Sequence, residues 1–184
     1  MANRFVRAIE LVLNTATNGH FRVALIGGFA LPFHGVTRAT ADVDFLVESS
    51  GADLLHEALL AAGEVCLQRT GELANYDSTS PEIAPVDALY AQRPPSLAML
   101  ARAHTYKPSG APLAIPVVDP EGIIGLKVQA MANDAARRDR ERDDIRELLL
   151  AHRGRLDLGL VREYYRAFDL EAELEAILRE IEKQ

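Results

Sequence analysis

The tripeptide Asp119-Pro120-Glu121 divides this 184-residue chain into two parts with different hydrophobic patterns. It is a typical helix start, because aspartate can cap free backbone N–H groups, proline fits the first turn, and an acid is favoured there. After it, apolar residues recur at helical spacing, which predicts helices near 120–133, 138–152, 159–167 and 169–182. We therefore expect a core over residues 1–118 and a helical part over residues 119–184, packed on the core as one structural unit.

Before the tripeptide, short apolar runs alternate with amphipathic stretches. The runs predict strands near 21–26, 42–47, 65–68, 83–90 and 113–118, and helical spacing predicts helices near 3–17, 29–34, 52–62 and 96–103. The polar segment 69–82 is expected to be a loop, and Pro85 predicts an edge position or an irregular start for the strand that contains it. The order predicts an α+β (α/β) fold, a mixed β-sheet flanked by helices, and not a regular βαβ array.

The composition restricts the classes of function. A formal net charge of −7 argues against broad nonspecific binding of nucleic acid, which depends on basic surface, but it allows a local basic patch. The N-terminus lacks the charged-then-apolar pattern of a signal peptide, and no apolar run reaches the roughly 18 residues that a membrane span needs. We expect a soluble cytoplasmic protein with no membrane partner.

Two acids alternate with apolar residues in the segment Asp42-Val43-Asp44-Phe45-Leu46-Val47. Alternate residues of a strand share a face, so Asp42 and Asp44 are expected to point the same way while Val43 and Phe45 face the core. Two carboxylates so close repel each other, and a bound divalent cation relieves that repulsion. Because Mg²⁺ prefers one or two carboxylates together with phosphate oxygens and water, the pair predicts a metal site that faces a phosphate compound.

A glycine pair, Gly27-Gly28, lies between a predicted strand and a predicted short helix. Glycine lets the backbone approach a ligand closely, and the free N–H groups at the start of the next helix suit a phosphate. Arg38 offers a cation for the phosphate charge. Thr40 shares strand parity with the two acids, so it is either a further ligand contact or a plain β-former.

Together, Gly27-Gly28-Phe29-Ala30, His34-Gly35 and Arg38-x-Thr40-x-Asp42-x-Asp44 resemble the minimal nucleotidyltransferases of the polymerase-beta-like superfamily, with AbiEii-like and related small stand-alone members as the nearest group. The resemblance covers roughly residues 21–150. It implies a nucleotidyltransferase-like mixed sheet and Mg²⁺ or Mn²⁺ as cofactor. It also implies a reaction that transfers a nucleoside monophosphate from an NTP to a hydroxyl acceptor. Where many members have Gly-Ser, this chain has Gly-Gly and so lacks one hydroxyl that could touch phosphate.

The superfamily carries a third acid on a later strand, and Asp87 is the candidate here. It is one acid within the apolar run Val86 to Tyr90 and needs a partner or a cleft, because an unpaired buried acid is unfavourable. By resemblance, Asp87 acts as general base toward the acceptor or completes the metal site with Asp42 and Asp44. The alternative is an exposed acid on an edge strand.

Lys127 falls on the apolar face of its predicted helix, so it either reaches out to solvent or faces a charged site. The resemblance matches Leu126-Lys127 and a later basic-acidic run, and it implies that Lys127 contacts the triphosphate while Asp144 orients it. Asp143 is a nearly equal candidate because the register of that run is ambiguous. The alternative for Asp144 is an ordinary helix salt bridge with Arg140.

Two functions remain open from the sequence. The first is a metal-dependent nucleotidyltransferase with an NTP as substrate and an unknown acceptor (a protein, a transfer RNA or a small molecule), with a role as a toxin–antitoxin component as one setting. The alternative is a catalytically inactive binding module of the same fold that acts as a nucleotide sensor or binds a partner protein. Residues 151–184 match nothing in the resemblance and read as amphipathic helices for packing or for a partner.

Overall fold

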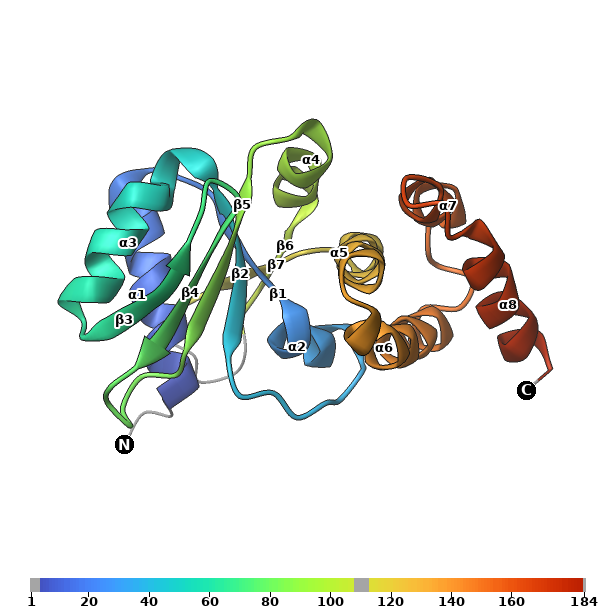
Figure 1. Cartoon of the computed structure of the whole chain (residues 1–184), viewed down its shortest axis with the longest axis horizontal. Coiled ribbons are helices and arrows are strands. Elements are labelled where there is room, and N and C mark those ends of the chain that lie inside the picture. Colours follow the sequence, from blue (N-terminus) through green and yellow to red (C-terminus); the bar gives the residue numbers. More distant parts are fainter. Residues whose placement is uncertain (1–3, 108–112, 184) are drawn as a thin grey trace. The chain divides into compact units, whose positions relative to one another are not determined.

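The computed structural model describes residues 4–107 and 113–183 (Figure 1). The chain divides into two compact units, one formed by Met1–Ala30 with Arg38–Val118 and one formed by Leu31–Thr37 with Asp119–Gln184. We call these the sheet unit and the helical unit. Asn3, where the first helix was predicted to begin, lies outside the described residues.

The sheet unit is built on one seven-stranded mixed sheet with the order β3-β4-β5-β2-β1-β7-β6. The pairs β2–β5 and β1–β7 are parallel, and all other neighbours are antiparallel. This confirms the predicted mixed sheet. The strands are β1 (Val23–Ile26), β2 (Val43–Glu48), β3 (Glu64–Arg69), β4 (Leu73–Ser78), β5 (Val86–Ala91), β6 (His104–Tyr106) and β7 (Ile115–Val117).

Two helices of the sheet unit, α1 (Arg4–Gly19) and α3 (Ala52–Ala61), pack against each other on one face of the sheet (Figure 1). Helix α4 (Pro94–Arg102) packs on β2 and β5. The central strands are the most buried, since every residue of β1 is buried and Val43, Phe45, Leu46 and Val47 of β2 are fully inaccessible. Short helices follow β1 and β2: α2 (Gly27–Ala30), and the 3₁₀ turn η2 (Ser49–Gly51).

The predicted loop over residues 69–82 was wrong, because β4 lies within it and pairs with both β3 and β5. The strand pattern is present in the sequence, since Ala74 and Tyr76 alternate with more exposed neighbours, but polar and turn-forming residues around it hide the alternation. The edge position considered for the strand after Pro85 was also wrong, because β5 lies between β4 and β2. The irregular start was correct: β5 begins at Val86, and the Pro85 carbonyl accepts a hydrogen bond from Val43 N at 2.9 Å.

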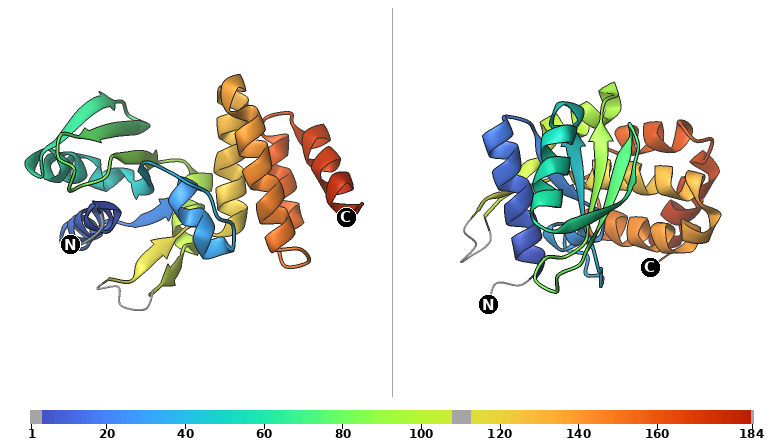
Figure 2. Two further views of the ribbon diagram at one scale, coloured as in Figure 1. Left: turned by 90° about the horizontal axis from the view of Figure 1, so that it is seen from below. Right: turned by 60° about the vertical axis from the view of Figure 1, so that its left-hand side comes forward.

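The helical unit contains four helices that match the predicted ones closely. They are α5 (Pro120–Asn133), α6 (Arg138–Ala151), α7 (Leu158–Arg166) and α8 (Glu171–Glu182), with the 3₁₀ turns η1 (Leu31–His34) and η3 (Ala135–Arg137). Helix α5 packs on α6 and α7, and α8 also packs on both α6 and α7 (Figure 2). The Asp119 carboxylate accepts a hydrogen bond from Gly122 N at 2.8 Å, which confirms the helix start. No described helix has the length and apolar character that crossing a membrane would need.

Glu64, the first residue of β3, is buried in the sheet unit with 3% of its surface exposed. Neither carboxylate oxygen has a partner with good hydrogen-bond geometry in the described ranges. Burial raises the pKa of Glu64, and the nearby Ser78 hydroxyl and the charge of Arg4 offset only part of this effect. An acid whose folded pKa lies above its unfolded value binds protons more strongly in the folded state, so its contribution to stability falls as pH rises through the folded pKa.

We expect Glu64→Gln to raise the free energy of unfolding at pH 7 by about 1 kcal/mol, because the neutral amide is buried at lower cost than the carboxylate. This gain in the free energy of unfolding should shrink as pH falls toward 4.5, the ordinary pKa of a glutamate. Chemical denaturation of both proteins between pH 4.5 and 8 measures it. Glu57→Gln, at an exposed glutamate of α3, is the matched control. If the stability of Glu64→Gln and of the unaltered protein changed in parallel over this range, the prediction would be wrong.

Candidate active site

Three carboxylates from two neighbouring strands meet in the sheet unit. Asp42 directly precedes β2, Asp44 is the second residue of β2, and Asp87 is the second residue of β5. Parallel pairing of β2 with β5 places Asp44 directly opposite Asp87. One oxygen from each of the three side chains lies within 4.8 Å of the others, and all three residues are half-buried. The structure therefore brings together the three acids that the sequence proposed as a set.

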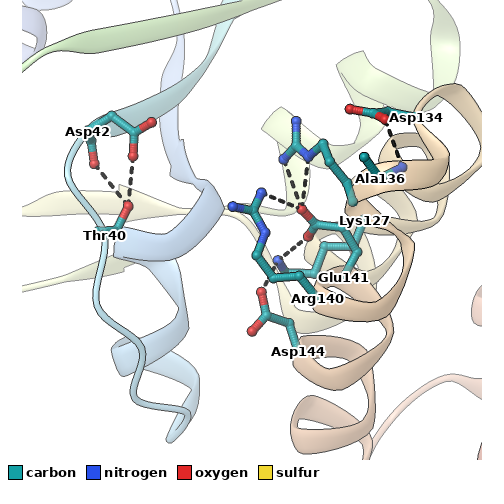
Figure 3. Close-up of polar contacts among 9 residues, drawn as sticks. Thr40, Asp42, Lys127, Asp134, Ala136, Arg140, Glu141 and Asp144 are labelled. Carbon is teal, nitrogen blue, oxygen red and sulfur yellow. Dashed lines mark hydrogen bonds and ion pairs between the residues drawn. The ribbon is translucent and has the colours of Figure 1, made fainter.

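The chemistry of this donor set suits a hard divalent cation. Three carboxylates within 4.8 Å of one another repel when ionised, and the groups present are oxygen donors of the kind that Mg²⁺ and Mn²⁺ take. The Thr40 hydroxyl donates a hydrogen bond of 2.7 Å to Asp42 Oδ1 and so holds one of the carboxylates (Figure 3). Thr40 thus has a definite role in the protein itself, beyond that of a plain β-former.

Gly27 lies directly after β1 and leaves space for one of the acids. A Cβ atom at this position would lie 1.9 Å from Asp44 Oδ2, which no real structure allows. Gly27 also has a φ of +63°, a left-handed conformation that glycine adopts without strain. The antiparallel register places Ile26 opposite Asp44, so the turn that begins at Gly27 passes beside the carboxylate. The glycine is therefore required by Asp44.

Gly28 makes room for two other residues of the predicted site. A Cβ atom on Gly28 would lie 2.8 Å from Cβ of Thr40 and 3.3 Å from Nη2 of Arg38. The structure thus places Gly28, Arg38 and Thr40 side by side, close to the carboxylate of Asp42 that Thr40 holds. Roles of Gly27, Gly28, Arg38 and Thr40 in nucleotide binding stay predictions.

Lys127 of α5 takes part in a buried charge cluster within the helical unit. Its Nζ lies 2.7 Å from Glu141 Oε2 and 2.6 Å from Asp144 Oδ2, both on α6 (Figure 3). The three residues are at most 6% exposed, so Lys127 does not reach out to solvent. Asp143 is exposed whereas Asp144 is buried in this cluster, and which of the two corresponds to the acid of the resemblance stays a prediction.

Glu141 is a member of this cluster that the sequence analysis missed. It precedes Asp144 by three residues on α6, a spacing that puts both acids on one helix face. Arg140 lies 2.9 Å from Glu141 Oε1, and Arg137 also donates to this oxygen at 2.9 Å. Two arginines of the basic-acidic run, Arg137 and Arg140, therefore contact this buried glutamate.

The pKa of Glu141 reflects two opposing effects. Burial acts to raise it, but the charge and hydrogen bond of Lys127 and the hydrogen bonds of Arg140 and Arg137 outweigh burial and lower the pKa to about 2. The stability that this acid contributes is present above the ordinary pKa of 4.5 and is lost as pH falls toward 2. Roles of Lys127 and Asp144 toward a nucleotide stay predictions.

We expect Gly27→Ala to lower the free energy of unfolding by more than the roughly 1–3 kcal/mol of a strained left-handed residue, because the added Cβ also displaces Asp44. Gly63→Ala is the matched control, since Gly63 has a φ of +93° with no atom within 4 Å of the added Cβ. Urea denaturation compares the two variants. Equal losses in both would show that Asp44 does not occupy the space beside Gly27.

We expect Lys127→Met to destabilise the protein by about 3–5 kcal/mol, because it leaves Glu141 and Asp144 buried without their shared cation. The triple variant Lys127→Met, Glu141→Gln, Asp144→Asn should recover part of that loss, since no uncompensated charge remains. Thermal and urea denaturation measure both. A triple variant that is less stable than Lys127→Met alone would contradict the buried cluster.

Comparison with known proteins gives matches at the level of structure. No protein-family model and no curated protein sequence matches this chain. Among solved structures, the antibiotic-resistance factor ANT(2'')-Ia is similar with a TM-score of 0.60 and 14% identity, over 97% of both chains. A nucleotidyltransferase-like antigenic protein from Paracoccidioides brasiliensis is similar with a TM-score of 0.57 and 16% identity, over 97% of this chain and 93% of that one.

A third similar structure is the lincosamide antibiotic adenylyltransferase LnuA in its lincomycin-bound form. Its TM-score is 0.52 at 12% identity, over 79% of this chain and 97% of that chain. At these identities the likeness establishes the fold and not the activity. The chain therefore has the fold of the nucleotidyltransferases, with its three clustered acids on β5 and at the start of β2.

Proposed function

We propose that this protein is a metal-dependent nucleotidyltransferase that transfers a nucleoside monophosphate from an NTP to a hydroxyl acceptor. The observation that carries the proposal is the set of carboxylates Asp42, Asp44 and Asp87, whose oxygens lie within 4.8 Å of one another in a protein with this fold. These three residues would hold Mg²⁺ or Mn²⁺. When bound, the metal supplies positive charge that neutralises the phosphate oxygens and the leaving group.

Other residues of the sheet unit are assigned to binding the nucleotide and to orienting the metal ligands. Gly27, Gly28 and Arg38 bind the triphosphate, through backbone N–H groups and a guanidinium, and Thr40 keeps the Asp42 carboxylate oriented. Positioning and charge neutralisation supply most of the rate in transfers of this kind.

Asp87 accepts the proton of the acceptor hydroxyl. The hydroxyl oxygen then forms a bond to the α-phosphorus, the bond from that phosphorus to the bridging oxygen of the β-phosphate breaks, and pyrophosphate leaves with the electron pair. The products are the nucleotidylated acceptor and pyrophosphate, so atoms and charge balance. Asp87 lies opposite Asp44 and is half-buried, so its carboxylate would both help to hold the metal and take the proton of a bound acceptor.

We propose a small hydroxylated molecule as the acceptor. Two structures with the same fold are named for antibiotics: one is ANT(2'')-Ia in complex with adenylyl-2''-tobramycin, with a TM-score of 0.62, and the other is LnuA with lincomycin. A net charge of −7 disfavours a transfer RNA, which needs basic surface. A protein and a transfer RNA are the other acceptor classes, a role as a toxin–antitoxin component is one setting for the activity, and the assay below distinguishes the three acceptor classes.

The test incubates the purified protein with each α-labelled NTP, Mg²⁺ or Mn²⁺, and three acceptor classes: hydroxylated antibiotics, transfer RNA and the protein itself. We expect label transfer to a small acceptor with release of pyrophosphate. Asp42→Asn with Asp44→Asn should lower the rate by at least about 100-fold, because charge stabilisation in the transition state is lost. Glu57→Gln, which removes an exposed acid of α3, is the control and should leave the rate unchanged.

Two outcomes would contradict this function in different ways. Nucleotide binding without turnover, together with a stable complex with another protein, would identify an inactive binding module. Absence of any NTP or Mn²⁺ binding, or binding that is unchanged in the Asp42/Asp44 variant, would remove the three carboxylates as a nucleotide site.

A further inference from the structure

The first turn of α1 contacts the segment that leads into the candidate metal site. Arg4, the first residue of α1, donates a hydrogen bond from Nη2 to the carbonyl oxygen of Ala41 at 3.3 Å. Ala41 directly precedes Asp42, and residues 37–42 form no regular secondary structure. A side-chain donor on a helix therefore fixes the backbone one residue before a candidate metal ligand.

The same residue also fixes the chain that leads to the second ligand strand. The carbonyl oxygen of Arg4 accepts a hydrogen bond from Ala84 N at 3.2 Å, three residues before Asp87. The next residue, Pro85, accepts a hydrogen bond from Val43 N at 2.9 Å, which joins the starts of β5 and β2. Arg4 thus bonds to both segments from which Asp42 and Asp87 emerge.

A third contact runs to the glycine turn. The Arg4 guanidinium carbon lies 5.2 Å from the centroid of the Phe5 ring, and the Phe5 and Phe29 rings have centroids 4.8 Å apart. Phe29 directly follows Gly28 in α2. The first turn of α1 therefore touches all three parts of the sheet unit that supply the site: the glycine turn, the Asp42 segment and the approach to Asp87.

The Arg4 side chain is partly buried in the sheet unit. Its Nε is buried without a hydrogen-bond partner among the residues that the structure describes, and the buried carboxylate of Glu64 attracts its charge. A guanidinium keeps a fixed planar fork of donors, so its place over the Phe5 ring limits the directions in which Nη2 can donate to Ala41.

From these contacts we infer that Arg4 is a positioning residue for the metal site: its guanidinium holds the Ala41-Asp42 backbone so that the Asp42 carboxylate converges with Asp44 and Asp87. This inference rests on the proposed function, since it assigns the three acids to a metal. Loss of the guanidinium lets the segment 38–42 move, and the set of carboxylates then binds Mn²⁺ more weakly.

The experiment compares Arg4→Met, Arg4→Lys and Arg7→Met. Arg7 lies on the same helix and forms an exposed ion pair with Glu82, so Arg7→Met removes an equally long cation from α1 without the contact to Ala41. Mn²⁺ affinity is measured by titration with electron paramagnetic resonance of the free ion. We expect Arg4→Met to bind Mn²⁺ about 3–10-fold more weakly, Arg7→Met to change less than 2-fold, and Arg4→Lys to recover part of the loss.

Hydrogen exchange gives a second measurement that does not depend on metal. Peptides that cover residues 38–45 and 82–88 should exchange faster in Arg4→Met than in the unaltered protein and Arg7→Met, in metal-free buffer. Thermal denaturation of all variants shows whether a general loss of stability accounts for the change. A merely structural role would lower the melting temperature of Arg4→Met, and Arg4→Lys would then not recover Mn²⁺ affinity.

The two proposals fail separately. If the unaltered protein binds Mn²⁺, the Asp42→Asn/Asp44→Asn variant does not, and Arg4→Met behaves like Arg7→Met, the role of Arg4 is wrong while the metal site stands. If the unaltered protein binds no Mn²⁺, the metal site is wrong, and unchanged exchange of residues 38–45 in Arg4→Met would overturn the backbone contact as well.

Discussion

Parallel pairing of β2 with β5 is the constraint on which the candidate site depends. The register sets Asp44 opposite Asp87, and a slip by one residue would turn Asp87 to the other face. Such a slip would also move Val86 and Ala88 out of the interior, so apolar burial fixes the register. Carboxylates a few ångströms apart repel by an amount on the order of a few kcal/mol per pair. Burial of the surrounding strand residues therefore holds together charges that would otherwise separate, and this is the state in which a cation binds most favourably.

In the helical unit, buried charges are held together by ion pairing between opposite charges. Lys127, Glu141 and Asp144 are buried together, and attraction between them compensates the loss of hydration. In the sheet unit the three acids are half-buried with an oxygen of each within 4.8 Å of the others, an arrangement of oxygen donors that suits a metal. The chain thus contains one acidic cluster completed by its own lysine and one whose composition favours a cation from solution.

The sequence predicted most of the fold because its signals were local. Helix α5 begins where Asp119 and Pro120 indicate, and alternation in β2 correctly grouped Asp42 with Asp44. What it could not predict depended on contacts between distant segments. The need for glycine at position 27 comes from the β1–β2 register, which brings the Asp44 side chain beside that turn. The contact of Glu141 with Lys127 depends on the packing of α6 on α5, which the sequence does not show. Strand β4 was not predicted because its alternation of buried and exposed residues is short and lies among turn-forming residues.

Residues 31–37 belong to the helical unit, although all of its other residues follow Val118. During synthesis this segment therefore leaves the ribosome before the whole of residues 38–118, and long before α5 to α8 exist. The residues of the sheet unit are all present once the chain has been made up to Val118. The helical unit can form only after the C-terminal third has been made, when that part packs with residues 31–37. In η1, the His34 carbonyl lies 3.0 Å from His152 Nε2, so this contact closes a loop that encloses most of the sheet unit. Closing so long a loop costs more conformational entropy than closing a short one, so we expect this contact to form after the contacts among α5 to α8.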